Sequence, residues 1–297
     1  MSIWAKFDCD CAKMAMSKII NSVCWKRVLV TICLNIFSPH AGVAAEESSN
    51  PLSITLGAGA ARLADYEGGR AQRAEVFPIV NASLKTDHGL LTLGGDASPP
   101  TNNIALLSWA VADPDRFVAA VLIDYDGGRR DDRSRTALHA GSPRLRGLGN
   151  LAGTLEYGVF GSYTVGIFVP NLDLRTALGG RGHGGTIVDF SIDIVVPLDE
   201  KTSITVSPSS TWASEKYMRS YFGITQAQST ASGFSLYKPA GGLKNIGLTI
   251  SANHKITKHW LAVVNIAALR LVGNAAGSPI VERTISFSPS AGAAYTW

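Results

Sequence analysis

The stretch "SAGAAYTW", Ser290–Trp297, alternates with a period of two. Trp297 and Tyr295 fall on one face of an extended segment, and Thr296 and Ala294 fall on the other. Such alternation is typical of a strand whose two faces meet different surroundings. Chain ends are usually loose, whereas an aromatic residue at the end of a strand pattern indicates a strand that is held. This stretch therefore predicts the closing strand of a β-barrel, with its aromatic side chains at a membrane interface.

The same alternation recurs along the chain, most clearly in residues 117–125, 186–196, 202–212 and 245–254. Each segment has about the ten residues that a tilted strand needs to cross a bilayer. Apolar residues on one face and polar residues on the other are the signature of a transmembrane barrel. A soluble β-sandwich with one wet face would show the same pattern, so alternation alone does not decide between the two.

The lengths of the connections favour the barrel. Strand candidates lie near 52–63, 74–85, 89–95, 103–111, 116–126, 149–160, 162–170, 186–197, 201–213, 244–256, 260–271 and 282–297. Short turns are expected at 86–88, 112–115, around Gly161, at 198–200 and at 257–259. Longer polar loops are expected at 64–73, 96–102, 127–148, 171–185, 214–243 and 272–281.

Strict alternation of short turns and long loops is the asymmetry of outer-membrane barrels, whose short turns face the periplasm. The sequence thus predicts an all-β fold: an antiparallel transmembrane β-barrel of outer-membrane type with about twelve strands, and ten strands as the alternative. Pro208 lies within a strand candidate, where it cannot donate to the ladder, so a bulge or a shorter strand is expected there.

Residues 1–45 have the pattern of a cleaved signal peptide. Lys26 and Arg27 precede the apolar run 28–37, and the small residues 41–45 form a cleavage site just before Glu46. All four cysteines lie in this segment, so no disulfide framework or thiolate metal site is expected in residues 46–297. Without the signal the chain is nearly neutral, which gives no electrostatic argument for nucleic acid. We expect one domain, the barrel of residues 46–297.

No motif in the sequence predicts a catalytic residue, a cofactor or a metal ligand set. "GGRGHGG", residues 179–185, has dinucleotide-motif spacing, but a strand pattern follows it, so a flexible loop tip is expected. "DYDGGRRDDRSR", residues 124–135, has carboxylates that could bind a hard cation. Its arginines favour a solvated loop with internal ion pairs instead. No histidine has metal-ligand spacing to another histidine or to a carboxylate motif.

Four polar residues are predicted to face the lumen: Asp189, Asp193, Thr249 and Asn253. Two interpretations remain for the two aspartates. They could tune the passage of cations, or they could fill a narrow lumen, paired with arginines across the barrel.

Residues 212–248 resemble the MipA/OmpV family of outer-membrane proteins. The telling pieces are Tyr217-Met218, Tyr221–Thr225, Ser232–Phe234 and Gly241–Leu243. Further pieces that fit are Tyr125–Arg129, Leu145–Leu151 and Ser278–Val281 before the terminal strand.

The resemblance implies an outer-membrane β-barrel of a Gram-negative bacterium without enzymatic activity. It also implies a scaffold that brings together murein-synthesising and lytic enzymes, with a lytic transglycosylase and a bifunctional penicillin-binding protein as partners alongside outer-membrane lipids. The alternatives are a narrow porin-like channel and a surface adhesin or antigen that acts through loops 127–148 and 214–243. The expected loop lengths leave little periplasmic surface for a scaffold, and no nucleic acid partner is expected.

Overall fold

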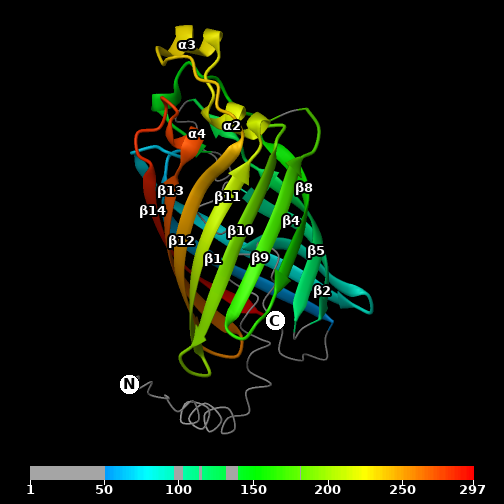
Figure 1. Cartoon of the computed structure of the whole chain (residues 1–297). Helices are drawn as coiled ribbons and strands as arrows, with labels where there is room; N and C mark the ends of the chain where they lie inside the picture. Colours follow the sequence, from blue (N-terminus) through cyan, green and yellow to red (C-terminus); the bar gives the residue numbers. More distant parts are fainter. Residues whose placement is uncertain (1–50, 97–102, 114–115, 132–139, 181) are drawn as a thin grey trace, which may run out of the picture.

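The computed structural model is a closed antiparallel barrel of twelve strands (Figure 1). It describes residues 51–96, 103–113, 116–131, 140–180 and 182–297. The last strand closes on the first, with Thr55 opposite Thr296 and Ala61 opposite Ser290. Closure leaves no unpaired sheet edge. The predicted twelve-strand barrel is therefore confirmed, and the ten-strand alternative is wrong.

The barrel strands follow each other around the wall in chain order. They are β1 (Leu52–Ala64), β2 (Gln72–Thr86), β3 (Gly89–Asp96), β4 (Asn103–Asp113), β5 (Phe117–Asp126), β8 (Thr154–Tyr163), β9 (Phe168–Ala177), β10 (Thr186–Pro197), β11 (Thr202–Ala213), β12 (Gly242–Lys255), β13 (Trp260–Leu271) and β14 (Ile285–Thr296). The other elements lie in the loops: β6 (Arg129–Arg130), β7 (Ala140–Gly141), the 3-10 turn η1 (Pro143–Leu145), α2 (Glu215–Phe222), α3 (Gln226–Ser232) and α4 (Gly273–Ala276).

Apolar and polar residues alternate between the two faces of the wall. In β12, Leu248 and Ile250 are exposed on the outer face, whereas Thr249 and Ser251 between them are buried in the interior. The outer face suits lipid and the interior is polar, as in other membrane barrels. Among the described residues, no helix is both long enough and apolar enough to span a bilayer.

One hairpin differs from the prediction. Gly161 is not a turn but lies within β8, opposite Leu172 of β9, and the turn comes at residues 164–167. The predicted long loop 171–185 is accordingly shorter, because β9 continues to Ala177. Leu172 and Leu174 alternate with polar neighbours, so the strand pattern in the sequence continues past Pro170.

Pro208 lies inside β11, so the expectation of a shorter strand is wrong. Pairing of β10 with β11 runs to Ser191 opposite Ser209 and resumes at Ile194 opposite Val206. Pro208 falls in that gap, where no ladder donor is needed. The irregularity on the other side of β11 lies between Thr211 and Trp212.

The two ends of the barrel differ as predicted. One end, here called the short-turn end, has the tight turns between β2 and β3, β8 and β9, β10 and β11, and β12 and β13. The C-terminus of the chain lies at the short-turn end as well (Figure 1). Tyr295 contacts the rings of His259, Trp260 and Trp297 with centroids 4.6–5.3 Å apart, which is the aromatic cluster expected of an interface girdle. The predicted signal segment, residues 1–45, lies outside the described residues.

The opposite end, here called the loop end, holds the helices (Figure 1). One apolar cluster joins α2 to the wall and to α4 through Tyr217, Met218, Phe222, Leu271 and Ala275. A second cluster joins residues from four different loops: Tyr66, Leu145, Leu148, Ile224 and Ile280. Because these loops start from strands all around the barrel, their packing forms a lid, defined here as α2, α4 and the second cluster.

Candidate functional site

Arg175 of β9 is the centre of a buried ion-pair network below the lid. Its guanidinium lies 3.0 Å from Asp173 Oδ1, 3.4 Å from Glu156 Oε2, 3.8 Å from Asp124 Oδ2 and 2.5 Å from Asp189 Oδ2. The four carboxylates come from β5, β8, β9 and β10, four strands that are neighbours in the wall. One planar, always charged group therefore joins four of the twelve barrel strands, a third of the wall.

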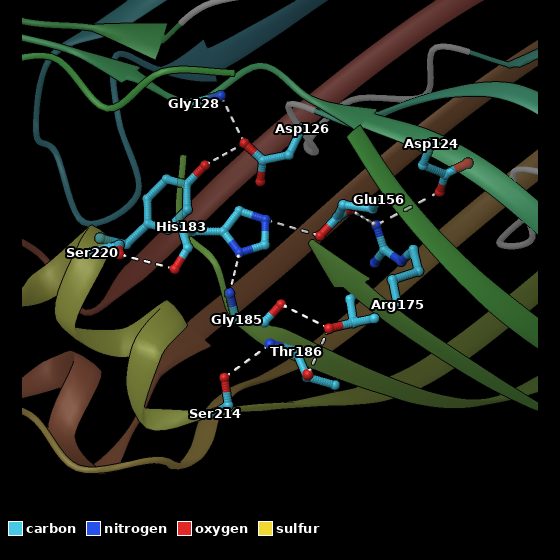
Figure 2. A network of polar contacts seen from close by, with 12 residues as sticks. Asp124, Asp126, Gly128, Glu156, Arg175, His183, Gly185, Thr186, Ser214 and Ser220 are labelled. Carbon is cyan, nitrogen blue, oxygen red and sulfur yellow. Dashed lines mark hydrogen bonds and ion pairs between the residues drawn. The ribbon is translucent and has the colours of Figure 1, made fainter. Parts of the chain in front are cut away.

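A second set of groups adjoins this network. Asp126 at the end of β5, Glu156 of β8 and His183 of the β9–β10 loop are all buried, and one potential ligand atom from each lies within 4.8 Å of the others. His183 Nε2 is 3.0 Å from Glu156 Oε1. Figure 2 shows Glu156 between His183 and Arg175, so that it belongs to both sets.

α2 closes this set from above. Tyr221 donates its hydroxyl hydrogen to Asp126 Oδ1, which also accepts from the backbone N–H of Gly128 at 2.6 Å. Arg129 in turn donates to the carbonyl oxygen of Tyr221 at 2.6 Å. The ring of His183 packs edge-on against Tyr217, with centroids 4.9 Å apart. The lid and the buried polar groups are thus one connected structure.

Glycines make these close approaches possible. Gly128 has a φ of +72°, and a Cβ there would lie 2.3 Å from Leu151 O. At Gly182, with a φ of +71°, a Cβ would overlap Thr154 Oγ1. Only glycine can adopt such a backbone at these contacts without strain.

The four residues predicted to face the lumen all lie on the interior face of their strands. Asp193, Thr249 and Asn253 are buried, and Asp189 is partly buried. The expected pairing with arginines across the barrel is wrong. Asp189 pairs with Arg175 on the neighbouring strand, and Asp193 accepts from Ser207 at 2.7 Å and from Asn171 at 3.0 Å. Donors on neighbouring strands satisfy both aspartates, so neither carboxylate needs an arginine from the opposite side of the barrel.

Two loop predictions are wrong for a common reason. The glycine-rich segment 179–185 is expected to be a flexible loop tip. Gly179 and Gly180 are exposed, but His183 is only 2% exposed and does not belong to a tip. The charged segment 124–135 was expected to be solvated, but Asp124, Asp126 and Arg129 are buried. Residues 132–139 of that segment lie outside the described residues. Asp126, Arg129 and His183 point inward under the lid, an arrangement that no local sequence pattern indicates.

The buried phenols of α2 should make the loop end sensitive to alkali. Burial, reinforced by the negative charge of Asp126, raises the pKa of Tyr217 and of Tyr221 well above the ordinary value. The neutral phenol is favoured in the folded state, so its stabilisation is complete below about pH 10 and is lost as pH rises further. We expect stability to fall by about 1.4 kcal/mol per pH unit for each phenol in that range.

Spectrophotometric titration of the folded protein checks this expectation. Tyr217 and Tyr221 should titrate late and together with unfolding, as should Tyr66, because burial raises its pKa as well. Tyr217→Phe and Tyr221→Phe should each remove one late phenol. Titration of both phenols near pH 10 in a folded barrel would contradict the buried arrangement.

The comparison with known families decides what kind of barrel this is. The family model described as MltA-interacting protein MipA matches residues 56–297, which is nearly the whole barrel. The chain belongs to this family. The MipA/OmpV resemblance in the sequence is therefore confirmed. A search among curated proteins finds no match to the chain.

Solved structures similar to this MipA family member are distant. The translocator domain of the autotransporter NalP from Neisseria meningitidis is 11% identical, with a TM-score of 0.44, over 84% of this chain and 90% of that one. The NanC porin is 8% identical, with a TM-score of 0.42, over 82% and 98%. OmpT of Vibrio cholerae is 10% identical, with a TM-score of 0.32, over 75% and 65%. These are all outer-membrane or porin barrels, and at this similarity they carry no functional argument.

Proposed function

We propose that the protein is an outer-membrane docking protein without enzymatic activity that holds a lytic transglycosylase together with a bifunctional penicillin-binding protein. The observation that carries this proposal is the family match, because the family is named for interaction with MltA and its model spans the barrel from β1 to Trp297. The proposal includes export by a cleaved signal, residues 1–45, and insertion with the short-turn end in the periplasm.

The lid supports docking over transport. Loops from around the barrel meet over the interior, with Leu145, Met218, Phe222 and Ile224 at most 1% exposed. Such packing lies across the path that a solute would take from the loop end. The buried Arg175 network lies directly beneath it.

The short-turn end offers a surface for a periplasmic partner. Val165, Leu198, Ile256 and Trp297 lie at successive positions around it and are between 53% and 61% exposed. These four residues are called the apolar rim. Charged residues such as Lys201 adjoin them. Exposed apolar side chains with polar neighbours are typical of protein-binding surfaces.

The rim is rigid, because each turn is hydrogen-bonded to the next strand. The N–H of Val195 donates to Ile167 O at 2.8 Å, and the N–H of Lys255 donates to Lys201 O at 2.8 Å. The N–H of Trp297 donates to Ile54 O at 3.0 Å. A preformed surface loses little conformational entropy when a partner binds. A barrel end with short turns is therefore compatible with a scaffold function, even though the expected loop lengths leave little periplasmic surface.

Crosslinking in cells tests the proposal. The tagged protein, captured from outer-membrane fractions, should enrich a lytic transglycosylase and a penicillin-binding protein over an unrelated barrel. Leu198→Glu combined with Ile256→Glu should reduce that enrichment about tenfold or more, since each change places a charge in the centre of the proposed contact, where a few side chains carry most of the binding energy. Leu236→Glu is the matched control, because Leu236 is equally apolar and 49% exposed but lies at the loop end. No enrichment of either enzyme with the native protein would overturn the scaffold proposal.

A further inference from the structure

We propose that Asp126, Glu156 and His183 bind one divalent transition-metal ion beneath the lid, with Zn²⁺ as the probe of the site. This site is independent of the proposed docking function. Its ligands come from β5, β8 and the β9–β10 loop, so the ion would fasten that loop to the barrel wall.

The ligand atoms converge on one point. His183 Nε2 is buried, has no hydrogen-bond partner and faces Glu156 Oε1 at 3.0 Å. Figure 2 shows one carboxylate oxygen of Asp126 held by its neighbours and the other turned toward His183. A buried ring nitrogen and carboxylate oxygens that converge this closely are suited to share a cation.

The remaining atoms of these residues are held from outside. Asp126 Oδ1 accepts from Tyr221 and Gly128, and Glu156 Oε2 pairs with Arg175 at 3.4 Å. This is the outer-shell support that metal-binding carboxylates usually have, and it fixes the orientation of the oxygens that remain. The surrounding contacts therefore fix the orientation of Asp126 and Glu156, as comparable contacts do for the ligands of known metal sites.

The donor set indicates the class of metal. One imidazole nitrogen and two carboxylates suit Zn²⁺ or a similar first-row ion, whereas Ca²⁺ and Mg²⁺ prefer six or more oxygen ligands. Two donors bound at about 2.0–2.2 Å to a tetrahedral ion lie roughly 3.3–3.5 Å apart, close to the observed 3.0 Å between His183 and Glu156. Three protein ligands leave one position for water.

One contact must change when the metal binds. The N–H of Gly185 donates to His183 Nδ1 at 3.1 Å, which places the proton of the neutral ring on Nε2. Coordination through Nε2 requires that proton to move to Nδ1 and the Gly185 amide to turn away. The neighbouring Gly184, with no side chain to restrict it, gives the segment that freedom. Without metal, the alternative is the arrangement in this structure, with His183 Nε2 beside Glu156 Oε1 at 3.0 Å and the Gly185 contact kept.

Metal content and metal titration of the full-length protein in detergent distinguish these two states. The native protein, stripped with a chelator, should bind one Zn²⁺ per chain by equilibrium dialysis with elemental analysis. Added Co²⁺ should give a visible absorption band that Zn²⁺ displaces. His183→Gln should weaken Zn²⁺ binding at least about tenfold while both carboxylates remain.

Two further variants keep the result interpretable. Asp126→Asn leaves the Arg175 network in place and should weaken Zn²⁺ binding as His183→Gln does. His254→Gln is the matched control, because His254 is exposed at the short-turn end and should leave binding unchanged. If the native protein binds no more Zn²⁺ than His183→Gln, or if His254→Gln abolishes the Co²⁺ band, the proposal is overturned. A negative result in the metal-binding experiments would not affect the docking proposal, which is tested separately by partner capture at the apolar rim.

Discussion

Replacing Arg175 with methionine is expected to destabilise the barrel by about 3–5 kcal/mol, the usual effect of removing one partner from a buried ion pair. Arg175 has 9% of its side chain exposed and pairs with Asp124, Glu156, Asp173 and Asp189. Without the guanidinium, four like charges remain close together in the interior. Methionine preserves the apolar stem, so the change reports the charge rather than the packing.

Urea unfolding in phospholipid vesicles, followed by tryptophan fluorescence and by heat-dependent gel mobility, measures the effect. Arg175→Lys should give an intermediate loss, because an ammonium ion cannot reproduce the planar fork. The matched control is Arg219→Met, whose arginine pairs with Glu215 on α2 with both side chains more than half exposed. That change should cost less than about 1 kcal/mol. Equal stability of Arg175→Met and Arg219→Met would show that the network contributes nothing.

The sequence predicts most of the wall because the wall is made by local periodicity. Interior and lipid-facing residues must alternate in every strand, so each strand carries its own signal. The β8–β9 hairpin is the exception, because the sequence predicts a turn at Gly161, whereas Ser162 continues the ladder opposite Asn171. Glycine is permitted in a strand interior as well as in a turn, and one residue type cannot distinguish them.

The candidate site could be predicted only in part. Glu156 and Arg175 stand on polar faces of alternating strands, so their interior orientation was readable from their neighbours. The sequence could not predict the proximity of Asp126, Glu156 and His183. The distances between them are set by barrel closure and by the path of two loops. The lid has the same origin: Tyr66 donates to Ile280 O at 2.8 Å across more than two hundred positions of sequence.

Truncating the lid is expected to open the barrel. Phe222 of α2 is 1% exposed and packs with Met218, and its carbonyl oxygen accepts from Ser278 at 2.6 Å. Phe222→Ala should reduce the stability of the lid by about 3–5 kcal/mol, since the cavity cannot be filled by the wall. The strands retain their ladders, so the barrel itself should remain folded.

Amide hydrogen exchange and planar-bilayer conductance together measure this opening. Exchange in α2 and in residues 142–148 should accelerate by the local loss of stability, while exchange in β9 and β12 should not change. The native protein should pass little current and Phe222→Ala should pass more, with a cation preference that weakens when Asp189→Asn and Asp193→Asn are added. These two carboxylates lie on the interior face below the lid, so their charge affects current only once the lid is open.

Leu236→Ala provides the control, because Leu236 is exposed at the same end and is not a member of either apolar cluster. If the native protein conducts as well as Phe222→Ala, the lid does not close the barrel, and the porin-like alternative gains the support that docking loses. If exchange in α2 accelerates while both proteins stay silent, the side chains that fill the interior, rather than the lid, block the passage. The two measurements thus locate the barrier either in the loops or in the polar interior around Arg175, which the distant likeness to porins cannot do.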